Sequence, residues 1–108
     1  MKTATSYSIV WVTAPDLKTA RVLCHGALRQ KLAACASVVP KIESHYWWKG
    51  KVESSAEVLL ILKTVRKRLP ALEKFILKNH PYETPEIVAC PMQSGNPSYL
   101  EWISSSVR

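Results

Sequence analysis

The stretch Val58–Leu62 places five consecutive aliphatic residues near the middle of this 108-residue chain. The run is too short for a helix of ordinary length and is rich in branched side chains, so it predicts a strand. Because neighbouring side chains of a strand point to opposite faces, Leu59 and Ile61 should face one way and the rest of the run the other. Burying each such side chain is worth about 1.5–3 kcal/mol. We therefore expect both faces of this strand to be covered.

Strand and helix signals alternate along the rest of the chain. Branched and aromatic residues indicate strands, and the spacing of apolar residues at three and four positions indicates helices. The predicted elements are a strand over Tyr7–Thr13, a helix from Leu17 to Leu28 capped by Asp16, a strand over Leu32–Val39 resuming at Ile42–Trp48, a strand over Lys51–Thr64, a helix from Arg66 to Asn79, a strand over Glu86–Met92, a turn over Ser94–Pro97 and a helix over Ser98–Val107.

This order, β-α-β-β-α-β followed by a short terminal helix, is typical of an α+β, ferredoxin-like fold in a single domain spanning residues 1–108. Right-handed crossovers place both main helices on the same side of the sheet. The other side would then be bare, although three of the strands are apolar on both faces. Soluble monomers rarely expose such a surface, so the pattern predicts a closed homo-oligomer that buries the sheet faces together.

Two positions indicate local packing. Gly26 lies inside the first predicted helix, where glycine costs about 1 kcal/mol relative to alanine, so it predicts close packing. Pro40 interrupts the second strand and predicts a bulge or an edge position, since proline cannot donate to a ladder.

The segment from Ile42 to Ala56 reads as a long hairpin turning at Lys49-Gly50. Its apolar residues are mostly aromatic, and it is too long to lie over its own core. We expect its tip to pack on another surface. Its tryptophans are interpreted as subunit-contact anchors, with a base-stacking surface as the alternative.

Composition restricts compartment and partners. Cys24, Cys35 and Cys90 show no paired spacing, which predicts free, buried thiols and a reducing, cytoplasmic location. No membrane-length apolar run or targeting segment is visible, so no direct membrane insertion is expected. The net charge is +7. Arg66–Arg68 is the tightest cationic cluster, read as a solvated helix start or an anion contact. It lacks interleaved aromatic residues, so nucleic acid is not expected as a partner.

Candidate chemistry concentrates in the loop His80–Pro85, which two prolines stiffen. Lys63, at the end of a central strand, is expected to meet a carboxylate of this region. The structural alternative is a histidine ending a helix beside a packing tyrosine and an ion pair. No catalytic motif is present, so no enzyme is predicted. The remaining enzymatic alternative uses Glu83 or Glu86 as a base.

Several segments resemble the CutA family of divalent-cation tolerance proteins. They cover the chain in order from about Ile9 to its end. The matching segments are Thr13–Asp16, Lys31–Cys35, Tyr46–Lys51, Glu57–Thr64, His80–Ile87 and Tyr99–Trp102.

The resemblance implies a compact homotrimer of ferredoxin-like subunits, similar to PII-type signalling proteins. It implies a non-enzymatic role in tolerance of copper and other divalent cations, with a ligand or metal site at the subunit cleft. The residues expected there are Trp48, Lys63, Tyr82, Glu83 and Glu86 as ligand-binding residues and His80 as a metal ligand. The alternatives are a PII-like module that binds a small anion, and a scaffold assisting membrane anchoring of acetylcholinesterase, as animal relatives are linked to that process.

One departure from the family concerns copper. Bacterial members implicated in copper binding carry a cysteine before the segment matching Thr13–Asp16 and two adjacent histidines before Pro-Tyr. The corresponding residues here are Val12, Asn79 and His80. Only the histidine at position 80 is retained.

Overall fold

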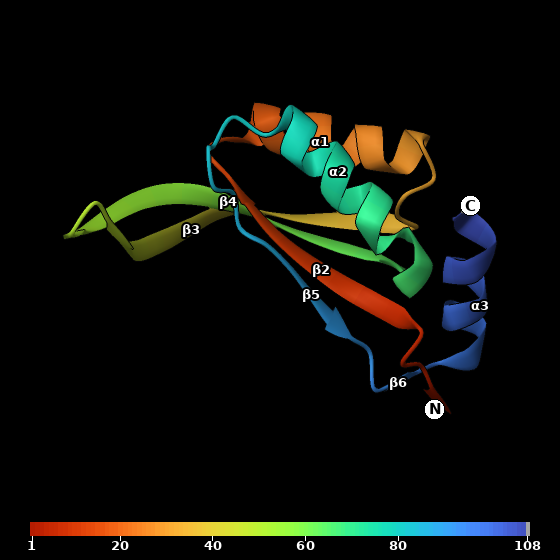
Figure 1. Ribbon diagram of the computed structural model, residues 1–108. Coiled ribbons are helices and arrows are strands. Elements are labelled where there is room, and N and C mark those ends of the chain that lie inside the picture. The colour runs from red at the N-terminus through yellow and green to blue at the C-terminus, as the bar shows by residue number, and fades with distance from the viewer. Residues whose placement is uncertain (108) are drawn as a thin grey trace.

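An antiparallel sheet of four strands, with two helices packed on one face, forms the body of the molecule (Figure 1). The structure is a computed structural model that describes residues 1–107. The strand order is β3-β4-β2-β5, and a separate two-stranded sheet joins β1 to β6. The elements are β1 (Lys2–Thr3), β2 (Tyr7–Ala14), α1 (Leu17–Arg29), β3 (Cys35–Trp48), β4 (Lys51–Val65), the 3-10 helix η1 (Arg66–Arg68), α2 (Leu69–Asn79), β5 (Ile87–Pro91), β6 (Ser94–Gly95) and α3 (Pro97–Ser106).

This arrangement confirms the predicted α+β, ferredoxin-like order with a terminal helix. The second predicted helix begins at Arg66 as the 3-10 helix η1 and becomes α-helical at Leu69. Two further boundaries were wrong. The second strand begins at Cys35 instead of Leu32, because α1 ends in a Schellman-type turn: Lys31 has φ 59°, and the Leu32 N–H bonds the Ala27 carbonyl at 2.9 Å. The expected turn over Ser94–Pro97 instead contains β6, since Ser94 and Gly95 pair with β1.

The core lies between the sheet and the two helices. The side chains of Val58, Leu60 and Leu62 on β4 are buried there against residues of α1 and α2. Gly26 of α1 meets the ring of Phe75 in α2 so closely that a Cβ would overlap with its Cζ atom. This confirms the close packing predicted at that glycine.

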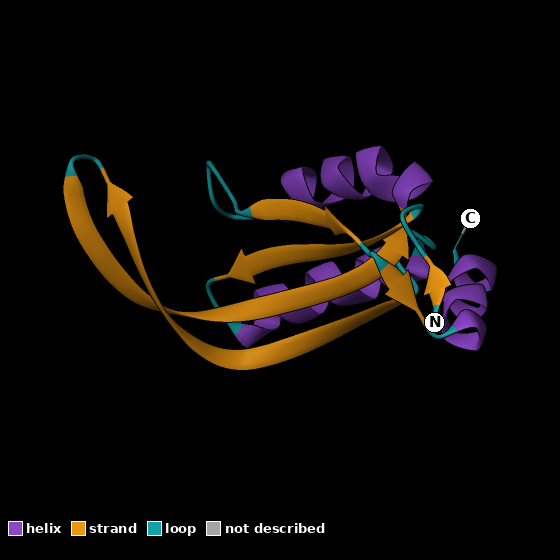
Figure 2. Ribbon diagram, turned by 90° about the horizontal axis from the view of Figure 1, so that it is seen from below, coloured by secondary structure: helices purple, strands orange, loops and turns teal. Residues whose placement is uncertain are grey.

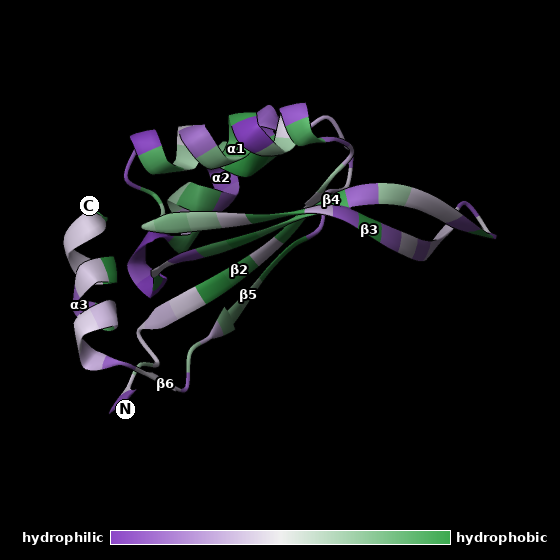
Figure 3. Cartoon of the chain, turned by 180° about the vertical axis from the view of Figure 1, so that it is seen from behind, coloured by the Kyte–Doolittle hydropathy of each residue, from purple (hydrophilic) through white to green (hydrophobic). Residues whose placement is uncertain are grey.

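The opposite face of the sheet is the open face, meaning the side that α1 and α2 leave uncovered (Figure 2). The register places Trp11 of β2 between Ile61 of β4 and Val88 of β5. Trp11 and Ile61 are partly exposed, and Val88 is 50% exposed. The hydropathy colouring shows apolar residues running along these strands (Figure 3). Leu59 and Ile61 therefore face away from the core, as the sequence predicted.

The hairpin of β3 and β4 continues beyond the body as an arm, residues 42–56 (Figures 1 and 2). The pairing shifts between Val39 and Ile42, which confirms a bulge at Pro40, and β3 is also an edge strand. Lys49 and Gly50 turn with φ values of 50° and 79°. The arm makes the molecule 44 Å long, and its radius of gyration is 14.5 Å, against about 13 Å for an ordinary domain of 100 residues.

Two burial predictions were wrong in this chain. Only Cys24 of the three cysteines is buried; Cys35 is partly exposed and Cys90 exposed, because both belong to strands that line the open face or its edge. Leu28, assigned to the buried stripe of α1, is 36% exposed, since it lies in the last turn of the helix. Among residues 1–107, no helix is long and apolar enough to cross a membrane.

Candidate functional site

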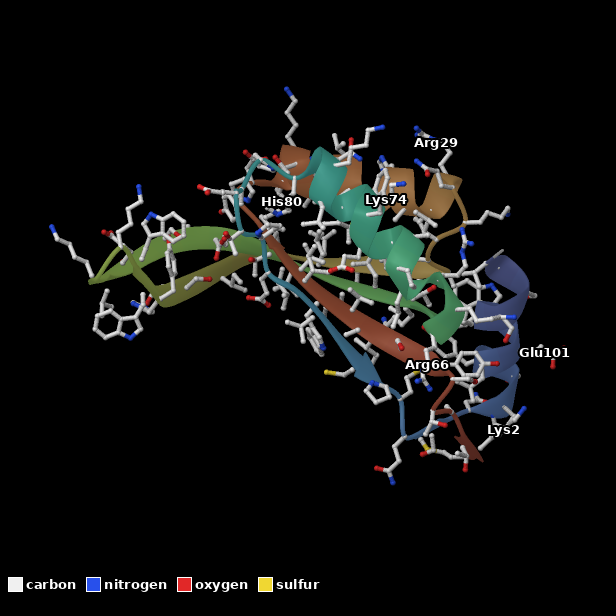
Figure 4. The ribbon with its side chains drawn as sticks, viewed as in Figure 1. Lys2, Arg29, Arg66, Lys74, His80 and Glu101 are labelled. Carbon is white, nitrogen blue, oxygen red and sulfur yellow. The ribbon has the colours of Figure 1, made fainter. Side chains whose placement is uncertain are left out.

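His80 is buried where α2 ends, above the start of the arm (Figure 4). Its backbone is extended, as expected for a residue before proline. Its Nε2 lies 2.7 Å from the Thr13 carbonyl oxygen, which can only accept, so Nε2 carries the proton. Its Nδ1 accepts the Tyr82 N–H at 3.1 Å. Both ring nitrogens are therefore engaged, and the imidazole is held as the neutral Nε2–H tautomer.

Tyr82 connects this histidine to a buried carboxylate. Its hydroxyl donates to Glu57 Oε2 at 2.8 Å, and its ring lies 4.8 Å from that of His80. Glu57 is only 8% exposed. Burial, and then the hydrogen bond and negative charge of Glu57, raise the pKa of Tyr82 far above its ordinary value. The hydroxyl thus remains a donor at physiological pH. We call Thr13, Glu57, His80 and Tyr82 the His80 network.

The structure brings together only two of the predicted site residues, His80 and Tyr82. Glu83 and Glu86 are exposed on the neighbouring loop and make no side-chain hydrogen bond within residues 1–107. Lys63 lies six residues from Glu57 along β4, and this corresponds to about 20 Å in an extended strand. No ion pair of Lys63 with Glu83 or Glu86 forms within the described part of the chain.

Trp48 is equally remote from the network within one chain. It pairs with Lys51, which lies six residues from Glu57 on the arm side, again about 20 Å along the strand. Its side chain is 45% exposed, with the Lys49 ammonium 5.8 Å from the ring centre. Within a single subunit, Trp48, Lys63 and the His80 network are therefore far apart from one another on the sheet and arm.

Sequence reasoning missed Glu57 and Thr13 as members of the network. Glu57 carried a usable signal, because it is a carboxylate directly beside the longest aliphatic run and such a residue is rarely buried without a partner. Thr13 contributes its backbone carbonyl, so its side-chain type gave no indication.

Metal-ligating side chains are dispersed. Within residues 1–107, no group of three or more His, Cys, Asp or Glu side chains could hold a metal ion. His45 pairs with Glu43 at 2.7 Å on the arm, in a groove of about 710 Å³. His80 has the orientation that metal-binding histidines usually take, with one ring N–H donated to a carbonyl. Its remaining nitrogen is occupied by the Tyr82 N–H, which a metal would displace.

The open face also carries thiols near Lys63. Lys63 is the register partner of Cys35 and of Ile9, and Ile9 pairs in turn with Cys90. The Cys35 Sγ lies 3.7 Å from the Tyr99 hydroxyl of α3. Burial, then the contact with Cys35, raises the pKa of Tyr99. Burial raises the pKa of Cys24, which keeps that thiol protonated and unreactive.

Comparison with known proteins places these features in context. Residues 8–106 match the family described as CutA1 divalent ion tolerance protein. The chain is 46% identical to the rice protein "Protein CutA 1, chloroplastic" over 93% of its own length and 56% of that relative. It is 42% identical to the Escherichia coli "Divalent-cation tolerance protein CutA" over 96% of its length and 93% of that protein.

The fold agrees with these matches. The crystal structure of CutA1 from Oryza sativa superposes with a TM-score of 0.93 at 44% identity, covering 97% of this chain and 96% of that one. The chain spans about half the length of the rice relative's full sequence and nearly the whole of the bacterial one.

Proposed function

The chain belongs to the CutA1 divalent ion tolerance family, and from this premise we propose that it serves divalent-cation tolerance as a homotrimer without enzymatic activity. The observation that carries the proposal is the open face. Its central row, Trp11, Ile61 and Val88, is apolar, and no element among residues 1–107 covers it. Sister copies that bury this face would complete the fold, with the helices outside.

The same assembly gives the arm a place to pack. Trp47 is 74% exposed and Val52, its register partner, is 62% exposed at the arm's tip. Exposed aromatic residues on an extension of this kind suit a contact with a neighbouring subunit. We propose that neighbouring copies bring Trp48 of the arm and Lys63 of the sheet toward the His80 network and its loop, forming the cleft expected from the sequence.

The proposed ligand of that cleft is copper or another divalent cation. His80 would bind it through Nδ1, while the hydrogen bond from Nε2–H to Thr13 holds the ring in place. The exposed carboxylates of Glu83 and Glu86 lie within six residues of His80 and supply oxygen ligands and charge. Binding at Nδ1 would replace the hydrogen bond from the Tyr82 N–H. A metal ion and this hydrogen bond therefore compete for the same nitrogen.

Two measurements test this proposal. Light scattering should give three times the 12.2 kDa mass of the chain. Calorimetric titration with Cu²⁺ should show binding that is lost in His80→Ala and retained in His25→Ala, because His25 is an exposed histidine of α1 outside the network. A mass of one chain would overturn the trimer, and equal copper binding in both variants would overturn the assignment to His80.

A small anion is the second candidate ligand, and Lys63 motivates it. Lys63 lies on the open face between Ile9 and Cys35 and forms no ion pair within residues 1–107. A partly buried ammonium without a carboxylate is an attractive partner for an anion. Phosphate or a nucleotide should then release or absorb heat with the native protein and with Lys41→Gln, but not with Lys63→Gln. Heat with Cu²⁺ and none with these anions would favour the metal.

We propose a reducing, cytoplasmic compartment on the ground that all three cysteines are free thiols. The rice relative is named chloroplastic. Localisation of the tagged protein in its own cells would distinguish the two compartments.

A further inference from the structure

The net positive charge of this protein belongs to the two main helices and the residues that flank them in sequence. The two helices with their flanking residues, 16–31 and 66–79, contain nine of the fifteen Lys and Arg residues and two of the eight Asp and Glu residues, which gives +7. The rest of the sequence contains six of each sign and is neutral. The whole formal net charge therefore belongs to the helical layer, which we define as α1, η1 and α2 with these flanking residues.

The cations of this layer are accessible. On α1, Lys18, Arg21 and Arg29 are exposed, and on α2 the exposed cations are Lys74 and Lys78. Figure 4 labels Arg29 and Lys74 on the two helices, which run side by side over the sheet (Figures 1 and 4). The two acids of the layer are Glu73 and Asp16. Asp16 caps α1 through the Thr19 N–H at 2.7 Å, so its charge is already engaged at the end of the layer.

Apolar side chains stand exposed between these cations. Val22 is 54% exposed, Leu77 is 51% exposed and Leu28 is 36% exposed. Each has charged neighbours in sequence, as in Arg21-Val22, Leu28-Arg29 and Leu77-Lys78. The layer thus combines cations and aliphatic groups on two adjacent helices. Since it lies on the side of the sheet opposite to the open face, sister copies on that face leave it available (Figure 1).

From this distribution we propose that the helical layer is a docking surface for anionic phospholipid membranes. Lysine and arginine near such a surface are attracted to its headgroups, and aliphatic side chains gain by entering the boundary with the acyl chains. A nucleic acid would satisfy the cations but offers no environment for Val22, Leu28 and Leu77. The one Phe, Tyr or Trp residue of these helices, Phe75, is packed on Gly26 and is unavailable for base stacking.

An acidic peptide is a poorer match for the same surface. Peptides that bind helical proteins usually lie in a groove. One groove lies on the arm, away from the helices, and is lined by Glu43, His45 and Ser54 among others. A smaller one of about 250 Å³ lies between the start of α2 and β5, and its only charged lining residue is an acid, Glu73, which would repel an acidic peptide. A flat, extended anionic surface can contact the exposed side chains of both helices together.

Vesicle sedimentation tests this proposal with a charge-matched pair of variants. The first, Arg21→Glu/Lys74→Glu/Lys78→Glu, changes the helical layer. The second, Lys2→Glu/Lys41→Glu/Lys49→Glu, makes the same change in exposed residues outside the layer. Both variants lower the formal net charge from +7 to +1. Vesicles of phosphatidylcholine alone and of phosphatidylcholine mixed equally with phosphatidylserine serve as probes, and circular dichroism verifies folding.

We expect the native protein to sediment with the anionic vesicles only. At about fivefold for each cation near the surface, the helical variant should lose about a hundredfold in affinity, while the second variant loses several-fold at most. Val22→Ser/Leu77→Ser should also weaken vesicle binding at unchanged charge. Equal losses in the two charge variants, or no sedimentation of the native protein, would overturn the proposal.

Duplex DNA, added as a competitor, tests whether the helical layer binds nucleic acid instead of a membrane. If DNA binds more tightly than the vesicles and Val22→Ser/Leu77→Ser has no effect on either, the layer is a nucleic-acid surface and the lipid proposal is wrong. If DNA fails to displace the protein from the vesicles, the lipid proposal stands. The helical variant and Val22→Ser/Leu77→Ser leave the open face, the arm and the His80 network unchanged, so their results are independent of the trimer and the metal. Lys49 of the other charge variant lies in the turn of the arm, so light scattering must show that this variant keeps the native mass.

Discussion

The hydroxyl of Tyr82 donates a 2.8 Å hydrogen bond to Glu57, a carboxylate that is only 8% exposed. This contact ties the loop after α2 to the strand that carries the longest aliphatic run of the chain. Glu57 is buried and can only accept hydrogen bonds when ionised. It therefore needs the Tyr82 hydroxyl as a donor, and the same hydrogen bond holds the loop in its conformation.

Tyr82→Phe should therefore lower the free energy of unfolding by about 1–3 kcal/mol, because it leaves Glu57 buried without its donor. Glu57→Gln should cost less in the Tyr82→Phe background than in the native protein. Urea denaturation of the two single variants and the double variant measures this coupling. Strictly additive losses would show that the hydrogen bond contributes nothing to stability.

The tautomer of His80 gives a second prediction. Thr13 offers only a carbonyl oxygen and Tyr82 only an N–H, so the ring must carry its proton on Nε2. Nitrogen chemical shifts of the imidazole at alkaline pH should show a protonated Nε2 and a bare Nδ1. His80→Phe removes both bonds and should cost about 1–3 kcal/mol, whereas His25→Phe on the exposed side of α1 should change stability little. The opposite tautomer would contradict the network.

The His80 network also shows how far the sequence could lead. The loop from His80 to Pro85 was recognisable from its prolines and its mixture of polar residues, and Tyr82 and His80 do meet. The third partner, Glu57, lies more than twenty residues earlier, and the fourth is a backbone carbonyl. Contacts of this kind depend on the register between strands and helices, which local residue patterns do not specify.

The fold could be predicted from the sequence more fully than the site, for the same reason. The two-faced character of Val58–Leu62 required only the alternation of a strand, and the structure places its odd and even residues as predicted. The two-residue strands β1 and β6 were missed because such short pairs have no periodicity. Cys90 was predicted to be buried from its apolar neighbours, yet β5 is an edge strand and leaves it exposed within one chain.

Asp16 should make the stability of the protein fall as the pH is lowered into the acid range. The Thr19 N–H hydrogen bond lowers the pKa of this helix-capping carboxyl. A carboxyl with a lowered folded-state pKa contributes stability above its unfolded pKa of 3.8 and loses that contribution as pH falls through the folded value. Asp16→Asn keeps a capping oxygen that does not titrate. Above pH 3.8 the native protein should therefore melt at a higher temperature than Asp16→Asn. Below pH 3.8 the two melting temperatures should converge. Parallel curves would contradict this role.

Gly26 and Phe75 offer a test of helix packing. A Cβ at position 26 would overlap with the ring of Phe75, which should cost about 1–3 kcal/mol, while alanine improves the helix by about 1 kcal/mol. Gly26→Ala should thus lower or leave unchanged the free energy of unfolding. In a Phe75→Leu background the overlap is relieved, so the same change should become stabilising. Thermal melts of the four proteins would reveal this change of sign, and its absence would mean that the ring moves aside freely.

Ile61 tests the role of the open face most directly. It lies at the centre of that face between Trp11 and Ser37, and is partly exposed in one chain. Ile61→Glu should leave the subunit folded, because the side chain points away from the helical core, but it would introduce a carboxylate between apolar sheets. Light scattering should then give the mass of a single chain, 12.2 kDa. Val22→Glu, an equally drastic change on an exposed helix position, should keep the native mass. If both variants remain assembled, the contact between subunits lies elsewhere. The apolar row on the open face would then be buried by something other than a sister copy.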